Sequence, residues 1–151
     1  MDAEAVTRLR RVIGRLARLL NAAPVSENLT PTQASVLGLV AHRGPIGMTE
    51  LAELEGLNPT MLSRVVAKLV ETGLFRKLPN PADQRAVHLE ATDEGHAVHR
   101  RIIASRTTTV AQILDGLSPD VTDALLDALP ALEALAEGLR TKKGVTGATG
   151  L

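Results

Sequence analysis

The fold of this chain is decided by residues 58–90, NPTMLSRVVAKLVETGLFRKLPNPADQRAVHLE. Residues 59–72 carry apolar side chains at helical spacing, and Asn58 can cap the helix that they predict. A shorter helix over residues 50–55, capped by Thr49, comes before this helix, and a turn that contains glycine joins the two. Two helices joined in this way are typical of a helix-turn-helix.

A β-hairpin is predicted directly after the second of these helices. Residues 74–78 and 85–90 have the pattern of strands, and the six residues between them, two of which are prolines, form a turn. A hairpin in this position is the wing of a winged helix-turn-helix. The combination is far more specific than either part, because many helical hairpins resemble a helix-turn-helix.

Further helices are predicted on both sides of this region. Residues 3–20 form an amphipathic helix with arginines along one face, and Thr30 caps a second helix. After the hairpin, Thr92 caps a long helix. A last helix begins at Ser118 and should kink or break at Pro130, which cannot donate a backbone hydrogen bond. The fold class is therefore mainly α with a small β-hairpin wing.

The composition restricts the possible functions. The chain of 151 residues fits one domain and contains no cysteine, which excludes disulfides, thiolate metal sites and thiol redox sensing. Phe75 is its only aromatic residue, so the stacking surfaces that bind single-stranded nucleic acids are missing. The sequence shows neither a signal peptide nor an apolar run long enough to cross a membrane, and we expect a cytoplasmic protein.

The formal net charge is zero, but opposite charges are concentrated in different segments. Residues 58–89 hold five Lys and Arg against two Asp and Glu, whereas residues 115–137 hold six acidic side chains and no basic one. The basic segment suits the phosphate backbone of a nucleic acid. The acidic segment and the arginine face of the first helix are complementary, and they either pair with each other or both face solvent.

The helix over residues 59–72 has the two faces that a DNA-reading helix needs. The apolar residues expected to pack inward are Met61, Leu62, Val65, Val66, Leu69 and Val70. The polar stripe at helical spacing consists of Thr60, Ser63, Arg64, Ala67, Lys68 and Glu71. Short side chains permit close approach to the major groove, and arginine can bind guanine with two hydrogen bonds. A solvated amphipathic face would look similar, so the adjacent hairpin strengthens the DNA interpretation.

Asp83 and Arg85 lie in or next to the predicted turn of the hairpin. A basic side chain at this tip can reach the adjacent minor groove, whose narrow form concentrates negative potential. Asp83 could hold the Arg85 guanidinium through a charge-assisted hydrogen bond. The alternative is a surface ion pair with no role in DNA binding.

Four segments resemble the MarR family of transcriptional regulators. The run LTPTQASVL at residues 29–37 is similar to the opening of the family's second helix, and LSRVVAKLVETGLFR at 62–76 to its recognition helix and exit. DQR at 83–85 resembles the wing motif, and TDEG at 92–95 the start of the following helix. Ala91 departs from the family, which usually has leucine there, and we interpret this as a local packing change at the base of the wing.

The resemblance implies a DNA-binding transcriptional regulator, by family default a repressor, that acts as a homodimer on a pseudo-palindromic operator. It implies a single domain over residues 1–140, in which 30–95 form the winged helix-turn-helix and 1–22 and 96–140 supply dimerisation helices, followed by a flexible tail at 141–151. The residues predicted to contact double-stranded DNA are Thr49, Asn58, Thr60, Ser63, Arg64, Lys68, Arg76, Lys77, Asp83, Gln84 and Arg85.

The resemblance also implies release by a small-molecule effector, often an anionic aromatic compound, bound between the dimerisation and DNA-binding parts. Arg15 and His42 are candidates to bind it, although a salt bridge or a helix-end contact would explain both residues. His96 and His99 are helical neighbours, but without cysteine or clustered carboxylates they do not predict a metal site, and we expect no cofactor.

Two other classes of function are alternatives to DNA binding. The sequence contains no glycine-rich phosphate loop, no G-x-S-x-G motif and no cysteine nucleophile, so an enzyme is not expected. A winged helix that binds another protein instead of DNA is the more serious alternative, because the net charge is zero. Salt-dependent affinity that needs Arg64, Lys68 and Arg85 would distinguish DNA binding from this alternative.

Overall fold

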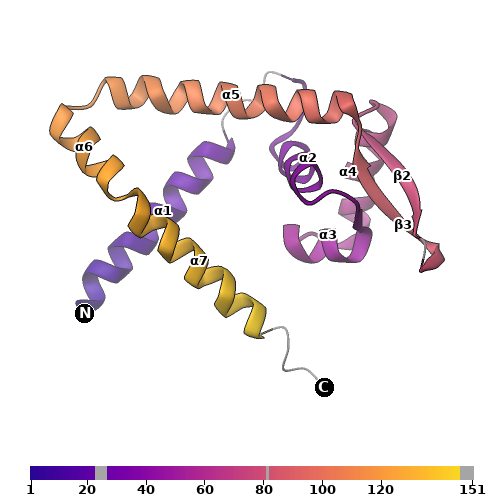
Figure 1. Cartoon of the computed structure of the whole chain (residues 1–151), viewed down its shortest axis with the longest axis horizontal. Helices are drawn as coiled ribbons and strands as arrows, with labels where there is room; N and C mark the ends of the chain where they lie inside the picture. The colour runs from indigo at the N-terminus through magenta and orange to yellow at the C-terminus, as the bar shows by residue number, and fades with distance from the viewer. Residues whose placement is uncertain (23–26, 81, 147–151) are drawn as a thin grey trace. The chain divides into compact units, whose positions relative to one another are not determined.

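The computed structural model describes residues 1–22, 27–80 and 82–146. The helices and strands, in chain order, are α1 (Ala3–Ala22), α2 (Pro31–Arg43), β1 (Ile46–Gly47), α3 (Met48–Glu55), α4 (Pro59–Glu71), β2 (Phe75–Asn80), β3 (Asp83–Ala91), α5 (Asp93–Asp115), α6 (Pro119–Asp127) and α7 (Leu129–Thr146) (Figure 1). Two compact units divide the chain, residues 1–107 and 108–151, and α5 runs from the first into the second. The mainly helical fold with a small antiparallel sheet confirms the predicted fold class.

The first unit has a single apolar core in which α2, α3, α4, the sheet and the start of α5 meet. Its fully buried side chains include Leu37 from α2, Leu51 from α3, Leu62 and Leu69 from α4 and Leu89 from β3. No polar or charged residue of the described chain is buried there. An all-apolar core of this kind fixes the position of α4 without hydrogen-bonding requirements of its own.

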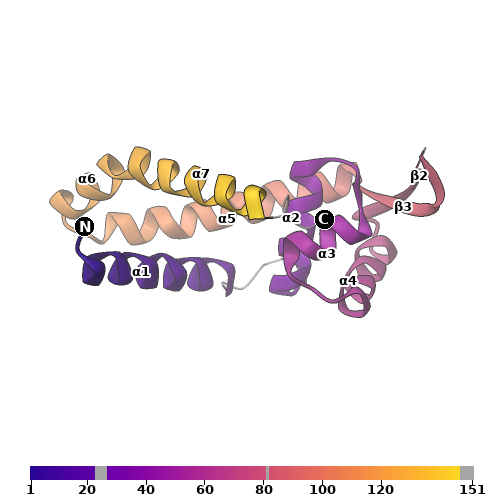
Figure 2. The same ribbon diagram turned by 90° about the horizontal axis from the view of Figure 1, so that it is seen from below.

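The sheet has three antiparallel strands in the order β1-β3-β2. In β1, a strand of two residues directly before α3, Ile46 pairs with Leu89 of β3. In the hairpin, Phe75 at the start of β2 pairs with Ala91, and both side chains are buried. The hairpin of β2 and β3 projects beyond the helices of the first unit, as a wing does (Figures 1 and 2).

Most predicted helix starts and breaks are confirmed. Thr30 and Gln33 form a capping box at α2, in which Thr30 Oγ1 accepts from the Gln33 amide at 3.1 Å and Gln33 Oε1 accepts from the Thr30 amide at 3.0 Å. The last helical segment is broken between α6 and α7, just before Pro130. The α7 helix continues to Thr146, inside the segment predicted as a flexible tail, and residues 147–151 lie outside the described residues.

Two local predictions are wrong. Thr49 does not cap α3, because the helix begins one residue earlier, at Met48, directly after the β1 pairing with β3, and Gly47 occupies the cap position. Met61 does not pack inward, because it lies in the first turn of α4 beyond the edge of the core, and 49% of it is exposed.

Candidate nucleic-acid interface

The predicted polar stripe of α4 is exposed along its whole length. Thr60, Ser63, Arg64, Ala67, Lys68 and Glu71 all face solvent. On the other side of the helix Leu62, Val66 and Leu69 are 1%, 2% and 0% exposed. The buried face holds α4 firmly on the core, so its outer face is presented as a rigid surface suited to a DNA groove.

The start of α4 is set by Asn58 and Pro59. Asn58 Oδ1 accepts a hydrogen bond from the Met61 amide at 2.8 Å, as an N-cap does, and Pro59 occupies the first helical position. One of the two lone pairs of the Asn58 oxygen is therefore used within the protein, and its amide nitrogen is free of hydrogen bonds within the described chain for the predicted DNA contact. The exposed Thr60 lies in the first turn, where the helix dipole favours a phosphate group.

Thr49 of α3 and Ser63 of α4 line the same groove between the two helices. The groove has a volume of about 620 Å³, and its other lining residues are Met48, Ala52, Glu53, Gly56, Leu57, Pro59 and Leu62. The structure thus brings Thr49 next to the polar stripe of α4, although Thr49 is not a helix cap. Both hydroxyl residues can contact one stretch of nucleic acid.

The wing carries three cations, which differ in what they contact. Arg76 Nε lies 2.8 Å from Glu90 Oε2 across the β2–β3 pair, so this guanidinium is held against the sheet. Lys77 and Arg85 are exposed and form no ion pair within the described residues. Lys77 and Arg85 are therefore the wing cations available to a phosphate or a base edge.

The Asp83 carboxylate shapes the tip of the wing. Its Oδ1 accepts a hydrogen bond from the backbone amide of Arg85 at 3.0 Å, and Asn80 Oδ1 accepts from the Ala82 amide at 2.9 Å. The predicted contact between Asp83 and the Arg85 guanidinium is not formed, because the carboxylate binds the backbone two residues ahead. The side chain of Gln84 lies outside the described part of the chain.

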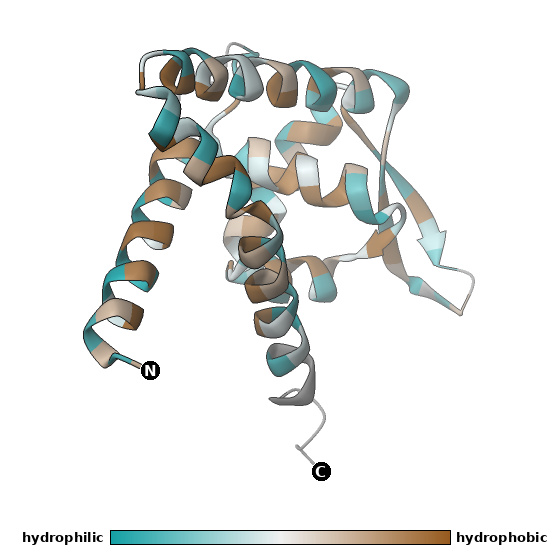
Figure 3. Ribbon diagram, turned by 60° about the vertical axis from the view of Figure 1, so that its left-hand side comes forward, coloured by the Kyte–Doolittle hydropathy of each residue, from teal (hydrophilic) through white to brown (hydrophobic). Residues whose placement is uncertain are grey.

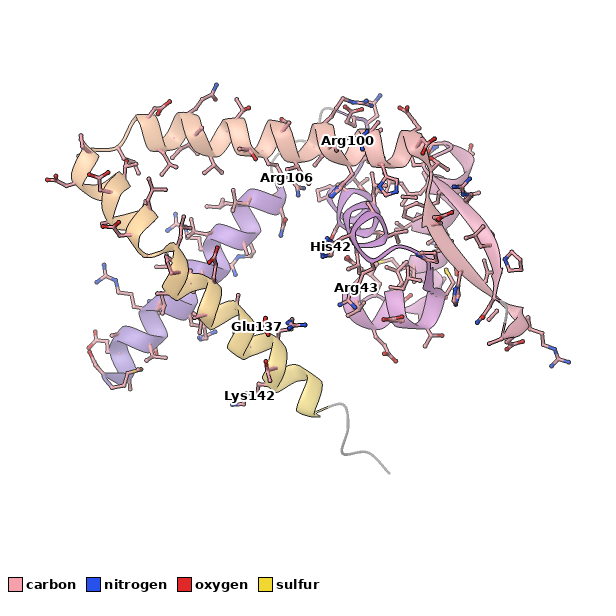
Figure 4. The ribbon with its side chains drawn as sticks, viewed as in Figure 1. His42, Arg43, Arg100, Arg106, Glu137 and Lys142 are labelled. Atoms are coloured by element: carbon pink, nitrogen blue, oxygen red, sulfur yellow. The ribbon has the colours of Figure 1, made fainter. Side chains whose placement is uncertain are left out.

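Four basic side chains at the α2–α5 contact, three histidines and one arginine, were not predicted as a unit. His99 on α5 lies close enough to His96 and Arg106 of the same helix, and to His42 near the end of α2, to interact electrostatically with each of them. Figure 4 labels His42 and Arg106, which come from these two helices. Burial above all, and then the charges of His96, Arg106 and His42, lower the pKa of the His99 imidazole. We call these four residues the cationic cluster.

Two atoms of the cationic cluster are buried without a partner. Neither His99 Nδ1 nor Arg106 Nε has a hydrogen-bond partner among the residues that the structure describes. Gly38 of α2 makes room for the His99 ring, since a Cβ at residue 38 would lie 3.1 Å from His99 Cε1. Unpartnered buried nitrogens of this kind are unfavourable unless a ligand or water satisfies them.

The predicted effector residues Arg15 and His42 lie on different helices. Arg15 is exposed on α1 and His42 is exposed on α2, and neither side chain forms a hydrogen bond or an ion pair within the described chain. The sequence analysis considered His96 and His99 only as metal ligands and did not join them with His42 and Arg106, although residues 96, 99 and 106 follow helical spacing along one side of α5. The contact with α2 could not be predicted, because it joins segments about sixty residues apart.

Comparison with known proteins identifies the relatives of this fold. A family model described as MarR family matches residues 29–87. The HTH-type transcriptional regulator YkoM of Bacillus subtilis is 26% identical over 129 residues, which are 83% of this chain and 84% of YkoM. The crystal structure of RV1404 from Mycobacterium tuberculosis has a TM-score of 0.68 and 30% identity, and the match covers 89% of this chain and 94% of RV1404. The chain belongs to the MarR family.

This MarR-family protein is a DNA-binding transcriptional regulator of a non-enzymatic family. A further relative, the HTH-type transcriptional repressor MdtR of Bacillus subtilis, is 27% identical over 94 residues, which are 62% of this chain and 61% of MdtR. The family match runs from α2 into β3 and includes the α4 stripe and the tip of the wing. The candidate DNA-facing surface described above therefore lies in the matched part of the chain.

Neither a metal site nor a membrane-spanning helix is found among the described residues of this MarR-family regulator. In the part of the chain that the structure describes, no group of three or more His, Cys, Asp or Glu side chains is placed to hold a metal ion. Among the described helices, none is both long and apolar enough to cross a bilayer.

Proposed function

We propose that this regulator acts as a homodimeric repressor on a pseudo-palindromic operator and is released by a small anionic effector. The proposal rests on one observation: the chain has both a cationic surface suited to DNA in the first unit and helices whose apolar faces are exposed in the single chain. The first surface suits DNA and the second suits another copy of the chain.

The DNA side of the proposal rests on Arg64, Lys77 and Arg85. All three are exposed and have no ion-pair partner within the described residues. Arg64 lies on the outer face of α4, where it can bind guanine in the major groove, and Arg85 lies at the wing, where it can reach the minor groove. Lys68 is less available, because its ammonium lies 3.8 Å from Glu71 Oε2.

The dimer side rests on helices that bury nothing by themselves. Within the described chain, neither α1 nor α6 has a buried residue. The exposed apolar side chains of α1 are Val6, Leu9, Val12, Leu16, Leu19 and Leu20, and those after residue 108 are Ile113, Leu117, Val121, Leu125, Leu126, Leu129, Leu132, Leu135 and Leu139. Brown apolar stretches are visible on α1 and on α7 in Figure 3.

Helices of this kind gain most of their stability from packing an apolar face, so they need a partner surface. A second copy of the chain supplies an identical one. In the proposed dimer, residues 1–22 and 96–140 pack against those of the partner, while residues 30–95 of each chain read one half-site. Twofold symmetry then places the recognition helices about 34–36 Å apart, one turn of DNA.

The effector side of the proposal rests on the cationic cluster. Its two unpartnered buried nitrogens, His99 Nδ1 and Arg106 Nε, together with the exposed His42 imidazole, suit a carboxylate or phenolate group. Arg15 remains a predicted contributor. An effector that binds the free form better than the DNA-bound form lowers operator affinity, typically by about 5- to 150-fold.

The experiment that tests DNA reading is fluorescence anisotropy of the full chain with DNA from the region upstream of its own gene. We expect tight binding that weakens with salt, and an Arg64→Ala, Arg85→Ala double variant that binds weakly at any salt concentration. Removal of one phosphate contact makes the plot of log affinity against log salt less steep, by about 1 in the magnitude of its slope.

The matched control for Arg64→Ala alone is Arg43→Ala. Arg43 is an exposed cation in the last turn of α2, so its removal changes the net charge by the same amount without touching the α4 stripe, the wing or the proposed dimer helices. Equal losses for Arg64→Ala and Arg43→Ala would contradict the assigned surface. Titration of the wild-type complex with salicylate or benzoate as anionic probes then tests release.

A further inference from the structure

The C-terminal end of α4 is in direct contact with the start of α5. The α4 helix ends in a Schellman motif: Gly73 has φ +78°, its amide donates to Val70 O at 3.0 Å, and the Leu74 amide donates to Leu69 O at 2.9 Å. The chain leaves the recognition helix through the carbonyls of Gly73 and Leu74.

Thr92 donates a hydrogen bond to each of these two carbonyls. Its Oγ1 donates to Gly73 O at 2.6 Å, and its backbone amide donates to Leu74 O at 3.0 Å. The same Oγ1 accepts from the Gly95 amide at 3.1 Å, as the N-cap of α5. One hydroxyl therefore links the end of the recognition helix to the first turn of α5, and it does so by donating and accepting at once.

Gly95 brings the two backbones into direct contact. A Cβ at this position would overlap the Leu74 carbonyl oxygen and lie 3.1 Å from the Leu74 carbonyl carbon. Residue 95 is buried, so no larger side chain fits without moving one backbone. We call Gly73, Leu74, Thr92 and Gly95 the α4–α5 joint.

We propose that Thr92 and Gly95 are positioning residues that set the angle of the recognition helix relative to α5, and thereby the half-site spacing that the dimer accepts. The inference rests on the proposed dimer. A contact made through long, flexible side chains would let the angle between the two helices vary. The short hydrogen bonds and the direct backbone contact at the joint restrict this angle. A small rotation at the joint moves the reading face of α4 and with it the preferred spacing.

Three substitutions at residue 92 separate this role from ordinary helix capping. Thr92→Ser keeps both the donor and the acceptor. Thr92→Asp keeps a good N-cap acceptor for the Gly95 amide but has no proton to donate to Gly73 O at neutral pH. Thr92→Val keeps the shape and loses both. Thermal unfolding of each variant shows which of them fold.

The experiment begins with operator DNA selected from a random library by the full wild-type chain. Anisotropy then gives the affinity of each variant for a single half-site and for paired half-sites whose spacing changes in single-base-pair steps. Wild type and Thr92→Ser should share one sharp optimum. Thr92→Asp and Thr92→Val should bind the single half-site normally but lose about tenfold of their discrimination between spacings.

The outcomes distinguish the two proposals. A wild-type protein without a spacing optimum would overturn the dimeric reading of the operator and the joint with it. A sharp wild-type optimum that Thr92→Asp and Thr92→Val both retain would overturn the joint alone. Loss of discrimination in Thr92→Val but not in Thr92→Asp would assign the effect to the helix cap, which also overturns the joint.

Discussion

Single residues in this regulator do work that depends on their immediate surroundings, and His99 is the clearest case. Its ring lies against Gly38, and its Nδ1 is buried. Protonation would put a positive charge near His96, Arg106 and His42, in a site that is partly shielded from water. The folded protein therefore resists protonation of His99.

This resistance predicts a pH dependence of stability. Because the pKa of His99 is lower in the folded chain than the ordinary value of 6.5, the unfolded state binds the proton more readily. The free energy of unfolding should therefore fall as the pH drops below about 6.5 and level off once the folded-state pKa is passed. Urea titrations at several pH values measure it, and His99→Gln should flatten the dependence. Identical pH profiles of the two proteins would contradict the assignment.

Two glycines in helices predict opposite effects of the same substitution. Gly95→Ala should destabilise the fold by about 1–3 kcal/mol, because the new methyl group meets the Leu74 backbone. Gly138→Ala in α7 meets nothing within 4 Å and should stabilise its helix by up to about 1 kcal/mol. Calorimetry measures both. Similar melting temperatures for the two variants would contradict the backbone contact at residue 95.

At the scale of helices and strands, the sequence predicted what nearby residues determine. The caps at Thr30 and Asn58 each need only a partner three residues ahead, so their pattern is visible in the sequence. The predicted start of α3 at residue 50 is wrong because β1 pairs with β3, about forty residues later in the chain, and this pairing is not visible in the local sequence. The cationic cluster escaped prediction for the same reason, since α2 and α5 meet only in the folded chain.

The cap of the recognition helix gives a prediction at this scale. Asn58→Ala leaves the Met61 amide without its partner and should lower the free energy of unfolding by about 1 kcal/mol. Fraying of the first turn should also weaken DNA binding, because Thr60 lies in that turn. Asn58→Ser keeps a capping oxygen, so it should restore both stability and affinity. If Asn58→Ser is stable but binds poorly, Asn58 contacts DNA through its own amide group.

At the scale of the whole molecule, the uncovered apolar surface is the dominant feature. Leu135 and Leu139 lie on one side of α7 and are 38% and 62% exposed. Charged residues at these positions should change the stability of a single chain little, because both leucines are exposed in it. They would, however, place charges inside the proposed dimer interface. Charged residues there should therefore separate the subunits without unfolding them.

Sedimentation equilibrium tests this expectation. The wild-type chain should have the mass of two copies, and Leu135→Asp, Leu139→Asp should have the mass of one at the same micromolar concentration. The control is Leu54→Asp, which alters an exposed leucine of α3 outside the proposed interface and should remain dimeric. A double variant with the wild-type mass would contradict the assignment of α7 to the interface.

The burial of Phe75 has a consequence for spectroscopy. The chain has no tryptophan or tyrosine, and its single aromatic ring lies 2% exposed at the base of the wing, paired with Ala91. Near-ultraviolet circular dichroism, which reports fixed packing of aromatic rings, therefore arises from one position in the winged-helix core. The far-ultraviolet signal comes from helices throughout the chain. Recorded together during melting, the two signals follow the loss of the winged-helix core separately from the loss of helix, without any added label.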